Sequence, residues 1–177
     1  MRVIGGEFRS RVLKSVPGIS VRPTPDRLRE ALFNVLAPRI AGSVFADLYA
    51  GTGAVGIEAL SRGASRVILI EQNRTALGVI RDNVKSLNAE ERVVIKQGRA
   101  SAFADNLPAD IVFVDPPYDL ESEYETVLQK LGQSASDIVI AQHSKRLDLS
   151  ERFGGLVRTR VIKQGDNALT LYQRVTD

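Results

Sequence analysis

The chain has 177 residues, 44% of them hydrophobic and 25% charged, with a formal net charge of +3, a balance that fits one soluble globular domain. The lack of cysteine excludes disulfides and thiolate nucleophiles, and with a single histidine no metal site is expected. No apolar run approaches the roughly 18 residues that span a bilayer, and no signal-peptide pattern opens the chain, so a cytoplasmic protein is expected.

Basic residues are concentrated at the start of the chain. Residues 1–40 hold eight Arg and Lys against three Asp and Glu, whereas residues 41–177 hold sixteen against eighteen. The alternating pattern of residues 2–14 around Gly5-Gly6 predicts a β-hairpin. A solvated edge hairpin is one interpretation of its charge, and a contact with a polyanion is the other. The side chains in question are Arg2, Arg9, Arg11, Lys14 and Arg22.

A helix is predicted directly after this basic segment. Thr24 can cap it, Pro25 suits the first helical position, and Asp26 suits the positive end of the helix dipole. Apolar side chains then recur at helical spacing until Pro38, which is the expected end. We therefore divide the chain into an arm of residues 1–22 and a main domain of residues 23–177.

Short apolar strands alternate with helical patterns from residue 44 onward. Strands are predicted at residues 44–49, 66–70, 92–96, 111–114 and 138–141. The clearest helices are residues 73–87 and 121–131. This alternation predicts an α/β fold with a mostly parallel sheet covered on both faces. Residues 156–163 and 168–174 are separated by only four residues and predict an antiparallel hairpin at the sheet edge.

A glycine-rich loop, DLYAGTGAVG, follows the first of these strands at residues 47–56. Glycines allow a tight turn and a close approach to a ligand, and the helix that follows presents its N–H groups. Glu71 ends the next strand, twenty residues after Gly51, where an acid can accept hydrogen bonds from ribose hydroxyls. Strand, loop, helix, strand and acid in this order predict a cofactor that contains adenosine.

Two such cofactors fit this loop. Gly51, Gly53 and Gly56 match G-x-G-x-x-G, which can hold the pyrophosphate of NAD. Asp47 would repel a pyrophosphate but suits an ammonium or sulfonium group, unless it only accepts hydrogen bonds from loop amides. The sequence also lacks a Tyr-x-x-x-Lys pair for hydride chemistry. S-adenosylmethionine is therefore favoured, and an NAD-dependent oxidoreductase is the alternative.

The fourth strand ends in Asp115-Pro116-Pro117-Tyr118. The two prolines stop the strand and stiffen the chain. In an open parallel sheet the first and fourth strands are neighbours where the winding reverses, and ligands bind beyond their carboxyl ends. Asp115 and the Pro116 carbonyl can there accept the two hydrogens of an exocyclic base amine, while Tyr118 stacks on the base.

Three stretches resemble the RsmD-type bacterial methyltransferases, which methylate the N2 amine of one guanine in small-subunit ribosomal RNA. They are RPTPDRLREALFN at residues 22–34, DLYAGTGAVGIEALSRGA at residues 47–64 and VFVDPPY at residues 112–118. The resemblance covers nearly the whole chain. It implies the class I S-adenosylmethionine-dependent methyltransferase fold, Rossmann-like, with seven strands.

The resemblance also implies roles for particular residues. Residues 115–118 would receive the base. With such a substrate, the charge of the basic arm of residues 1–22 leads us to expect that it contacts RNA, naked or in an assembled particle, and no obligate protein partner is expected. The cofactor would be bound by Thr24, Asp47, Tyr49, Gly51, Thr52, Gly53, Glu71, Gln72, Arg99 and Ala100.

Two segments depart from the family pattern. Residues 97–100 carry Arg99 where many relatives place an acid beside the adenine, so backbone contacts are expected there. After the fifth strand the family often has Glu where this chain has Gln142, and His143 next to it is expected at the surface or in a supporting position. Asp-Pro-Pro-Tyr is similar to the motif of adenine-N6 methyltransferases as well, so an adenine N6 amine is the alternative target.

Overall fold

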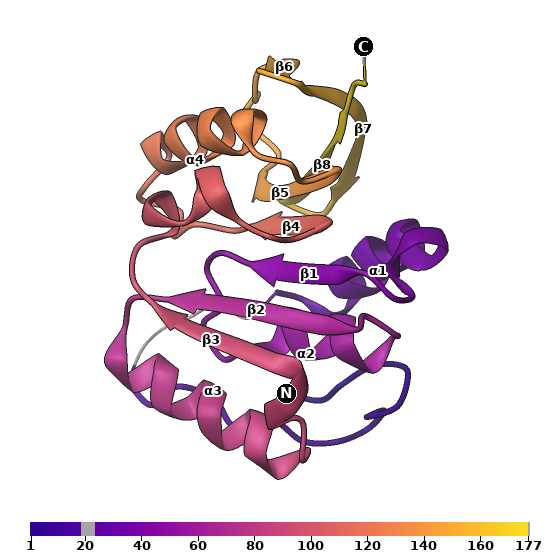
Figure 1. The fold of residues 1–177 in the computed structure, drawn as a ribbon, viewed down its shortest axis with the longest axis vertical. Helices are drawn as coiled ribbons and strands as arrows, with labels where there is room; N and C mark the ends of the chain where they lie inside the picture. Colours follow the sequence, from indigo (N-terminus) through magenta and orange to yellow (C-terminus); the bar gives the residue numbers. More distant parts are fainter. Residues whose placement is uncertain (19–23, 177) are drawn as a thin grey trace.

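The computed structural model describes residues 1–18 and 24–176, and within them eight strands form one sheet in the order β3-β2-β1-β4-β5-β8-β7-β6 (Figure 1). The strands are β1 (Val44–Asp47), β2 (Arg66–Glu71), β3 (Val93–Gln97), β4 (Ile111–Val114), β5 (Ile138–Ser144), β6 (Arg152–Phe153), β7 (Leu156–Gln164) and β8 (Asn167–Arg174). The first five strands pair in parallel, and β8, β7 and β6 continue the sheet antiparallel. The predicted α/β class with a C-terminal antiparallel hairpin is confirmed.

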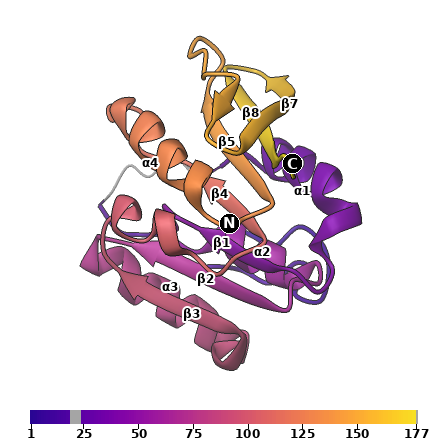
Figure 2. The ribbon, with the colours of Figure 1, turned by 45° about the horizontal axis from the view of Figure 1, so that its top comes forward.

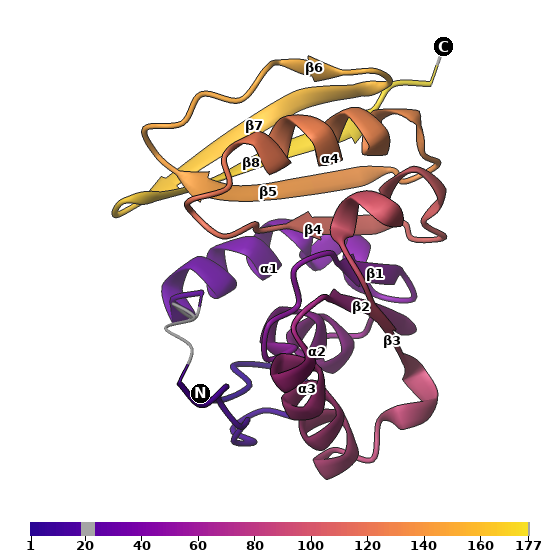
Figure 3. The same cartoon turned by 90° about the vertical axis from the view of Figure 1, so that its left-hand side faces the viewer.

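Helices cover both faces of the sheet. They are α1 (Asp26–Ile40), α2 (Ala54–Ser61), α3 (Arg74–Ser86) and α4 (Ser122–Gln133), with short 3₁₀ turns η1 (Glu90–Arg92), η2 (Ala100–Ala102) and η3 (Ala104–Asn106). One core lies between the sheet and α1, α2 and α3, and the other between the sheet and α4. Figures 2 and 3 show α1 and α4 on opposite sides of β4 and β5. In the described part of the chain, none of the helices has the length and apolar character needed to cross a bilayer.

The strand register brings the two predicted ligand loops to one edge. β1 lies between β2 and β4, with Asp47 opposite Leu69 on one side and Phe113 on the other. The first and fourth strands of the prediction are therefore neighbours. Since the carboxyl ends of parallel strands meet at the same edge, the glycine loop after β1 and the prolines after β4 face the same space.

The predicted N-terminal hairpin forms as a short antiparallel pairing rather than as two regular strands. Arg2 and Val12 form an isolated bridge, and the N–H groups of Val3 and Leu13 donate to the carbonyls of Arg11 and Met1 at 3.0 and 2.8 Å. Closer to the turn, the backbone amides bind α2 instead. The Glu58 carboxylate accepts hydrogen bonds from the N–H groups of Ile4 and Gly5 at 2.8 and 2.9 Å. A carboxylate more than fifty residues away in the sequence thus holds this segment against the main domain.

Helix α1 begins and ends one or two residues from the predicted positions. Pro25 rather than Thr24 is its N-cap, and no side chain caps it. Pro38 lies inside the helix rather than at its end. A proline in the last turn removes only one intrahelical hydrogen bond, and Ile40, 4% exposed, keeps the final residues against the core.

Two strands differ from the prediction because their pairing partners could not be inferred from the sequence. β5 runs three residues beyond its predicted end because it pairs antiparallel with β8 as far as Ser144 and Asn167. β6, the strand beyond the predicted seven, is two residues long and places Phe153 opposite Leu156.

Candidate active site

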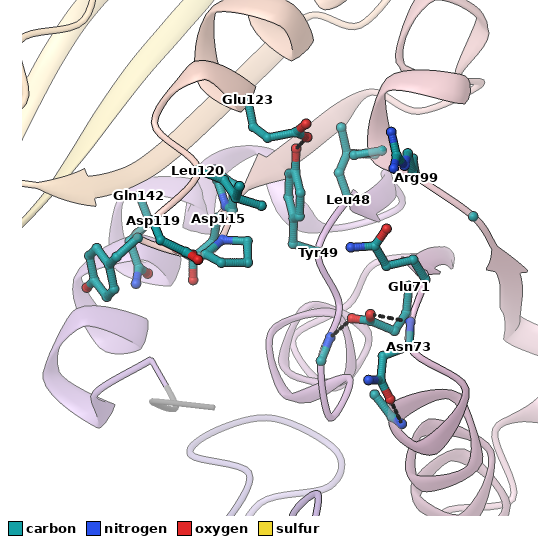
Figure 4. A pocket seen from close by; sticks show the side chains of 18 of the residues that line it. Leu48, Tyr49, Glu71, Asn73, Arg99, Asp115, Asp119, Leu120, Glu123 and Gln142 are labelled. Carbon is teal, nitrogen blue, oxygen red and sulfur yellow. Dashed lines mark hydrogen bonds between the residues drawn. The ribbon is translucent and has the colours of Figure 1, made fainter. Parts of the chain in front are cut away.

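A cavity of about 1030 Å³ lies at the carboxyl ends of β1, β2 and β4 (Figure 4). This volume suits a ligand of nucleoside size or larger. Its walls come from the glycine loop, the end of β2, the loop after β3, the segment after β4 and the end of β5. The lining residues are Pro25, Leu48, Tyr49, Gly51, Glu71, Gln72, Asn73, Ala76, Gly98, Arg99, Ala100, Asp115, Pro116, Pro117, Tyr118, Asp119, Leu120, Glu123 and Gln142.

Glu71 ties the glycine loop to the start of α3. One carboxylate oxygen accepts the Gly51 N–H at 2.8 Å, and the other accepts the Asn73 N–H at 2.9 Å. Asn73 in turn caps α3 by accepting the Ala76 N–H at 3.0 Å. Gly51 has a φ of 57°, which favours glycine. The carboxylate keeps unused lone pairs that face the cavity, where ribose hydroxyls can donate to them.

The other two glycines of the motif shape the protein rather than line the cavity. Gly53 is the N-cap of α2 with a φ of 83°. A Cβ on Gly56 would lie 2.3 Å from Cδ2 of Leu69, so glycine lets α2 pack closely on β2. The Thr52 carbonyl accepts a hydrogen bond from Nδ2 of Asn83 at 3.0 Å.

Two acidic residues lie at the ends of the neighbouring strands β1 and β4. Asp47 is 1% exposed and accepts the Tyr49 N–H at 3.1 Å, and burial raises its pKa to about 7. Burial, and after it the charge of Asp47, raises the pKa of Asp115 to about 8. Neither carboxyl forms an ion pair within residues 1–18 and 24–176. Asp47 is buried and Asp115 is half-buried. Carboxyls in such places without a cation suit a positively charged ligand, so the site fits the sulfonium of S-adenosylmethionine.

The segment after β4 is held as a rigid turn. The Leu120 N–H donates to the Pro117 carbonyl at 2.9 Å. The Tyr118 O–H donates to Oδ1 of Asn167, at the start of β8, at 2.6 Å. Tyr118 is still 48% exposed, so part of its ring is accessible for stacking.

Most of the predicted site residues line the cavity, and some do not. Tyr49, Gly51, Glu71, Gln72, Arg99, Ala100 and residues 115–118 line it. Thr24, Asp47, Thr52 and Gly53 do not, although Pro25 next to Thr24 does. The prediction missed Glu123, whose carboxylate accepts the Tyr49 O–H at 2.8 Å. Its place in the amphipathic pattern of α4 gave no signal for this role.

His143 is buried rather than at the surface. It is 3% exposed, its Nε2 lies 2.7 Å from Oγ1 of Thr170, and its ring meets that of Tyr124 edge to face. Burial lowers its pKa. Because it does not line the cavity, its contacts point to a supporting role.

The basic arm lies against α3, with several of its charges already engaged. Arg2 donates to the Ser10 carbonyl at 3.0 Å, and Arg11 to the Ser86 carbonyl at 2.5 Å. Lys14 pairs with Asp82 at 2.9 Å. Arg9 is exposed, and Arg22 lies outside the described residues.

A family model described as conserved hypothetical protein 95 matches residues 1–173. "Ribosomal RNA small subunit methyltransferase D" of Escherichia coli (strain K12) is 39% identical over 148 residues, which make up 82% of this chain and 75% of the relative. The chain belongs to the RsmD-type methyltransferase family. The solved structure of yhhF from Escherichia coli, 34% identical, matches 98% of this chain and 97% of its own with a TM-score of 0.87.

The same fold occurs in a solved structure of much lower sequence identity. An RNA methyltransferase from Salinibacter ruber, solved with S-adenosyl-L-homocysteine, is 18% identical and matches 88% of this chain and 95% of its own with a TM-score of 0.68. The predicted family, class I fold and S-adenosylmethionine cofactor are therefore confirmed. Membership of the RsmD-type family excludes the NAD-dependent oxidoreductase.

Proposed function

We propose that this enzyme transfers a methyl group from S-adenosylmethionine to the exocyclic N2 amine of a guanine in small-subunit ribosomal RNA. The observation that carries the proposal is the single cavity shared by the Glu71-supported glycine loop and the segment Asp115-Pro116-Pro117-Tyr118. The family relative of Escherichia coli named above gives the substrate class. Cytoplasmic ribosomes, free or during assembly, are the expected place of action.

The cofactor end of the cavity lies toward β2. Glu71 would accept hydrogen bonds from the ribose hydroxyls, and Gly51 leaves room for the backbone to approach the cofactor. Arg99 and Ala100 would provide backbone contacts beside the adenine. When bound, the cofactor supplies a methyl group already activated by its sulfonium charge. Asp47, just beneath the loop, would balance that charge through its buried carboxylate.

The base end of the cavity lies at β4. Beside the positive charge of the bound cofactor, which favours its ionised form, the Asp115 carboxylate would accept one amine hydrogen and the Pro116 carbonyl the other. Together they would aim the nitrogen lone pair at the methyl carbon. Tyr118 would stack on the base, which must be flipped out of any helix at a cost of a few kcal/mol. Asp115 would then pass the displaced proton to water. Positioning does most of this catalysis.

The arm of residues 1–22 would hold RNA phosphates. Because Arg11 and Lys14 are partly engaged by α3 and Asp82, we expect Arg9 and Arg22 to carry much of the contact. Replacing Arg9, Arg11 and Lys14 by Ala should lower RNA affinity and flatten its salt dependence. If the salt dependence of RNA affinity did not change, the arm would be a solvent-exposed segment that does not contact RNA.

The test uses small ribosomal subunits, and the free RNA, from cells that lack the protein. With labelled S-adenosylmethionine, nucleoside mass spectrometry should detect N2-methylguanosine, and N6-methyladenosine would refute the proposal in favour of the adenine alternative. Asp115→Ala should keep its affinity for S-adenosylhomocysteine and lose transfer by orders of magnitude. The surface variant Asp105→Ala, which removes an exposed ion pair with Lys130, is the matched control.

A further inference from the structure

The Gln142 side chain is almost completely buried, yet its amide oxygen has no hydrogen-bond partner. Its exposed fraction is 4%, and Oε1 is unpaired within residues 1–18 and 24–176. The Tyr124 O–H donates to the Gln142 backbone carbonyl, not to the amide. A buried acceptor without a donor destabilises a fold, so a residue of this kind points to a ligand that completes it. Gln142 also lines the cavity.

Strand register places Gln142 beside Asp115. Val114 on β4 is opposite Ala141 on β5, so the next residues on the two chains are Asp115 and Gln142. Phe113 and Ile140, two positions before Asp115 and Gln142, belong to the core between the sheet and α1. Side chains two apart in a strand point to the same face, so Asp115 and Gln142 both point to the α1 side of the sheet. Neighbouring parallel strands lie about 4.8 Å apart, so both side chains can contact one small ligand group.

Gln142 lies at the base end of the cavity. Figure 4 shows Glu71 and Arg99 on one side of Tyr49, and Asp115 and Gln142 on the other. The strand next to β5 in the sheet, β8, supplies Asn167, which accepts a hydrogen bond from the Tyr118 O–H. The Gln142 amide therefore lies between Asp115, which is assigned to the exocyclic amine, and β8, which holds the Tyr118 hydroxyl.

We propose that Gln142 binds the ring edge of the target base next to its exocyclic amine, with Oε1 accepting the N1–H of guanine. This inference rests on the proposed function and adds the residue that recognises the base. In guanine, N1 carries a hydrogen beside the N2 amine, whereas in adenine the nitrogen beside the N6 amine is an acceptor. A glutamine amide can accept from the N1–H of guanine with its oxygen, or, after rotation, donate to N1 of adenine with its nitrogen. An ionised carboxylate can only accept, so it can bind the N1–H of guanine alone.

The test compares wild type with Gln142→Leu and Gln142→Glu on small ribosomal subunits, and on the free RNA, from cells that lack the protein. Gln142→Leu keeps the volume and removes the acceptor, so kcat/KM for methyl transfer should fall by about 10- to 100-fold. The dissociation constant for S-adenosylhomocysteine should not change, and the Tm should stay equal or rise, because the variant removes an unpaired buried acceptor. Gln142→Glu should restore transfer to within about tenfold of wild type, because it can still accept the N1–H.

Three results with the Gln142 variants would overturn the inference. They are near-wild-type transfer by Gln142→Leu, a parallel loss of S-adenosylhomocysteine affinity, and a Gln142→Glu enzyme as inactive as Gln142→Leu. Ser136→Ala is the matched control, since it removes another unpaired buried oxygen, close to the other end of β5 and away from the cavity. It should transfer like wild type, and an equal loss there would also overturn the inference.

The wild-type product separates this inference from the proposed function. If wild type makes no N2-methylguanosine, the proposed function fails, and the assignment of Gln142 to guanine fails with it. If wild type makes N2-methylguanosine and Gln142→Leu matches it, only the role of Gln142 fails.

Discussion

The charge of Asp47 acts on Asp115 across the β1–β4 pair. Burial raises the pKa of Asp47 to about 7, and burial together with this neighbouring acid raises the pKa of Asp115 to about 8. Both values lie well above the ordinary 3.8 of an aspartate. The folded protein without ligand therefore holds more protons on this pair than the unfolded chain does at neutral pH.

The stability of the ligand-free protein should fall as pH rises from about 5.5 to 8.5. Carboxyls with a raised folded pKa contribute stability that is complete below the unfolded value and is lost as pH passes 7 and 8. Asp115→Asn should give a flatter Tm profile in scanning fluorimetry at constant ionic strength. His143, whose pKa burial lowers, has the opposite effect but is present in both proteins. Parallel profiles for the two proteins would contradict the raised pKa of Asp115.

The affinity for S-adenosylmethionine should rise with pH more steeply than that for S-adenosylhomocysteine. The first carries a sulfonium charge that favours ionised Asp47 and Asp115, whereas the second has a neutral sulfur. Binding of the charged form should therefore release protons between about pH 6.5 and 8.5. Calorimetry in buffers of different ionisation enthalpy measures this release. Equal proton release for both ligands would place the sulfonium away from these acids.

The sequence predicted the site best where local spacing determines geometry. The twenty residues from Gly51 to Glu71 are one strand–loop–helix–strand unit, and the acid meets the loop at 2.8 Å. The prolines after Val114 likewise ended β4 as predicted. In each case neighbouring residues in the chain decide the structure.

The failures came from partners far apart in the chain. The pairing around the Gly5-Gly6 turn is shorter than predicted, because Glu58 accepts the Ile4 and Gly5 amides. Gln142 shows no periodicity that marks it, because its neighbour Asp115 comes from a different strand and its burial depends on β8. Asp47 is only 1% exposed, a burial that its sequence neighbours did not indicate, and its contact with the cofactor stays a prediction. Sequence patterns do not contain such contacts.

Gly56 and Gly78 should respond in opposite ways to alanine. A Cβ at Gly56 would lie 2.3 Å from Leu69 and 2.8 Å from Val67, both fully buried, so overpacking should cost about 1–3 kcal/mol. At Gly78, within α3, nothing lies within 4 Å of an added Cβ. There alanine should add about 0.4–1 kcal/mol by restricting the unfolded chain. Urea unfolding of both variants measures the difference, and a stabilised Gly56→Ala would refute the close packing of α2 on β2.

Removing Glu58 should detach the basic arm from the main domain. Its carboxylate is fully buried and accepts hydrogen bonds from Ile4 and Gly5, and from Nε of Arg62 at 2.7 Å. Arg29, also fully buried, lies 3.9 Å from it and would lose its nearest buried counter-charge. Glu58→Ala should therefore destabilise the protein by about 3–5 kcal/mol.

Hydrogen exchange separates detachment of the arm from general loss of stability. In Glu58→Ala the amides of residues 3–5 should exchange faster than those of β1 and β4, whereas Glu58→Gln, which keeps one acceptor, should show a smaller change. If the arm holds RNA phosphates, the same variant should also bind RNA more weakly under conditions where its main domain stays folded. Unchanged protection of residues 3–5 would mean that contacts other than Glu58, such as that of the Phe8 N–H with Oγ of Ser61 at 2.8 Å, keep the arm in place.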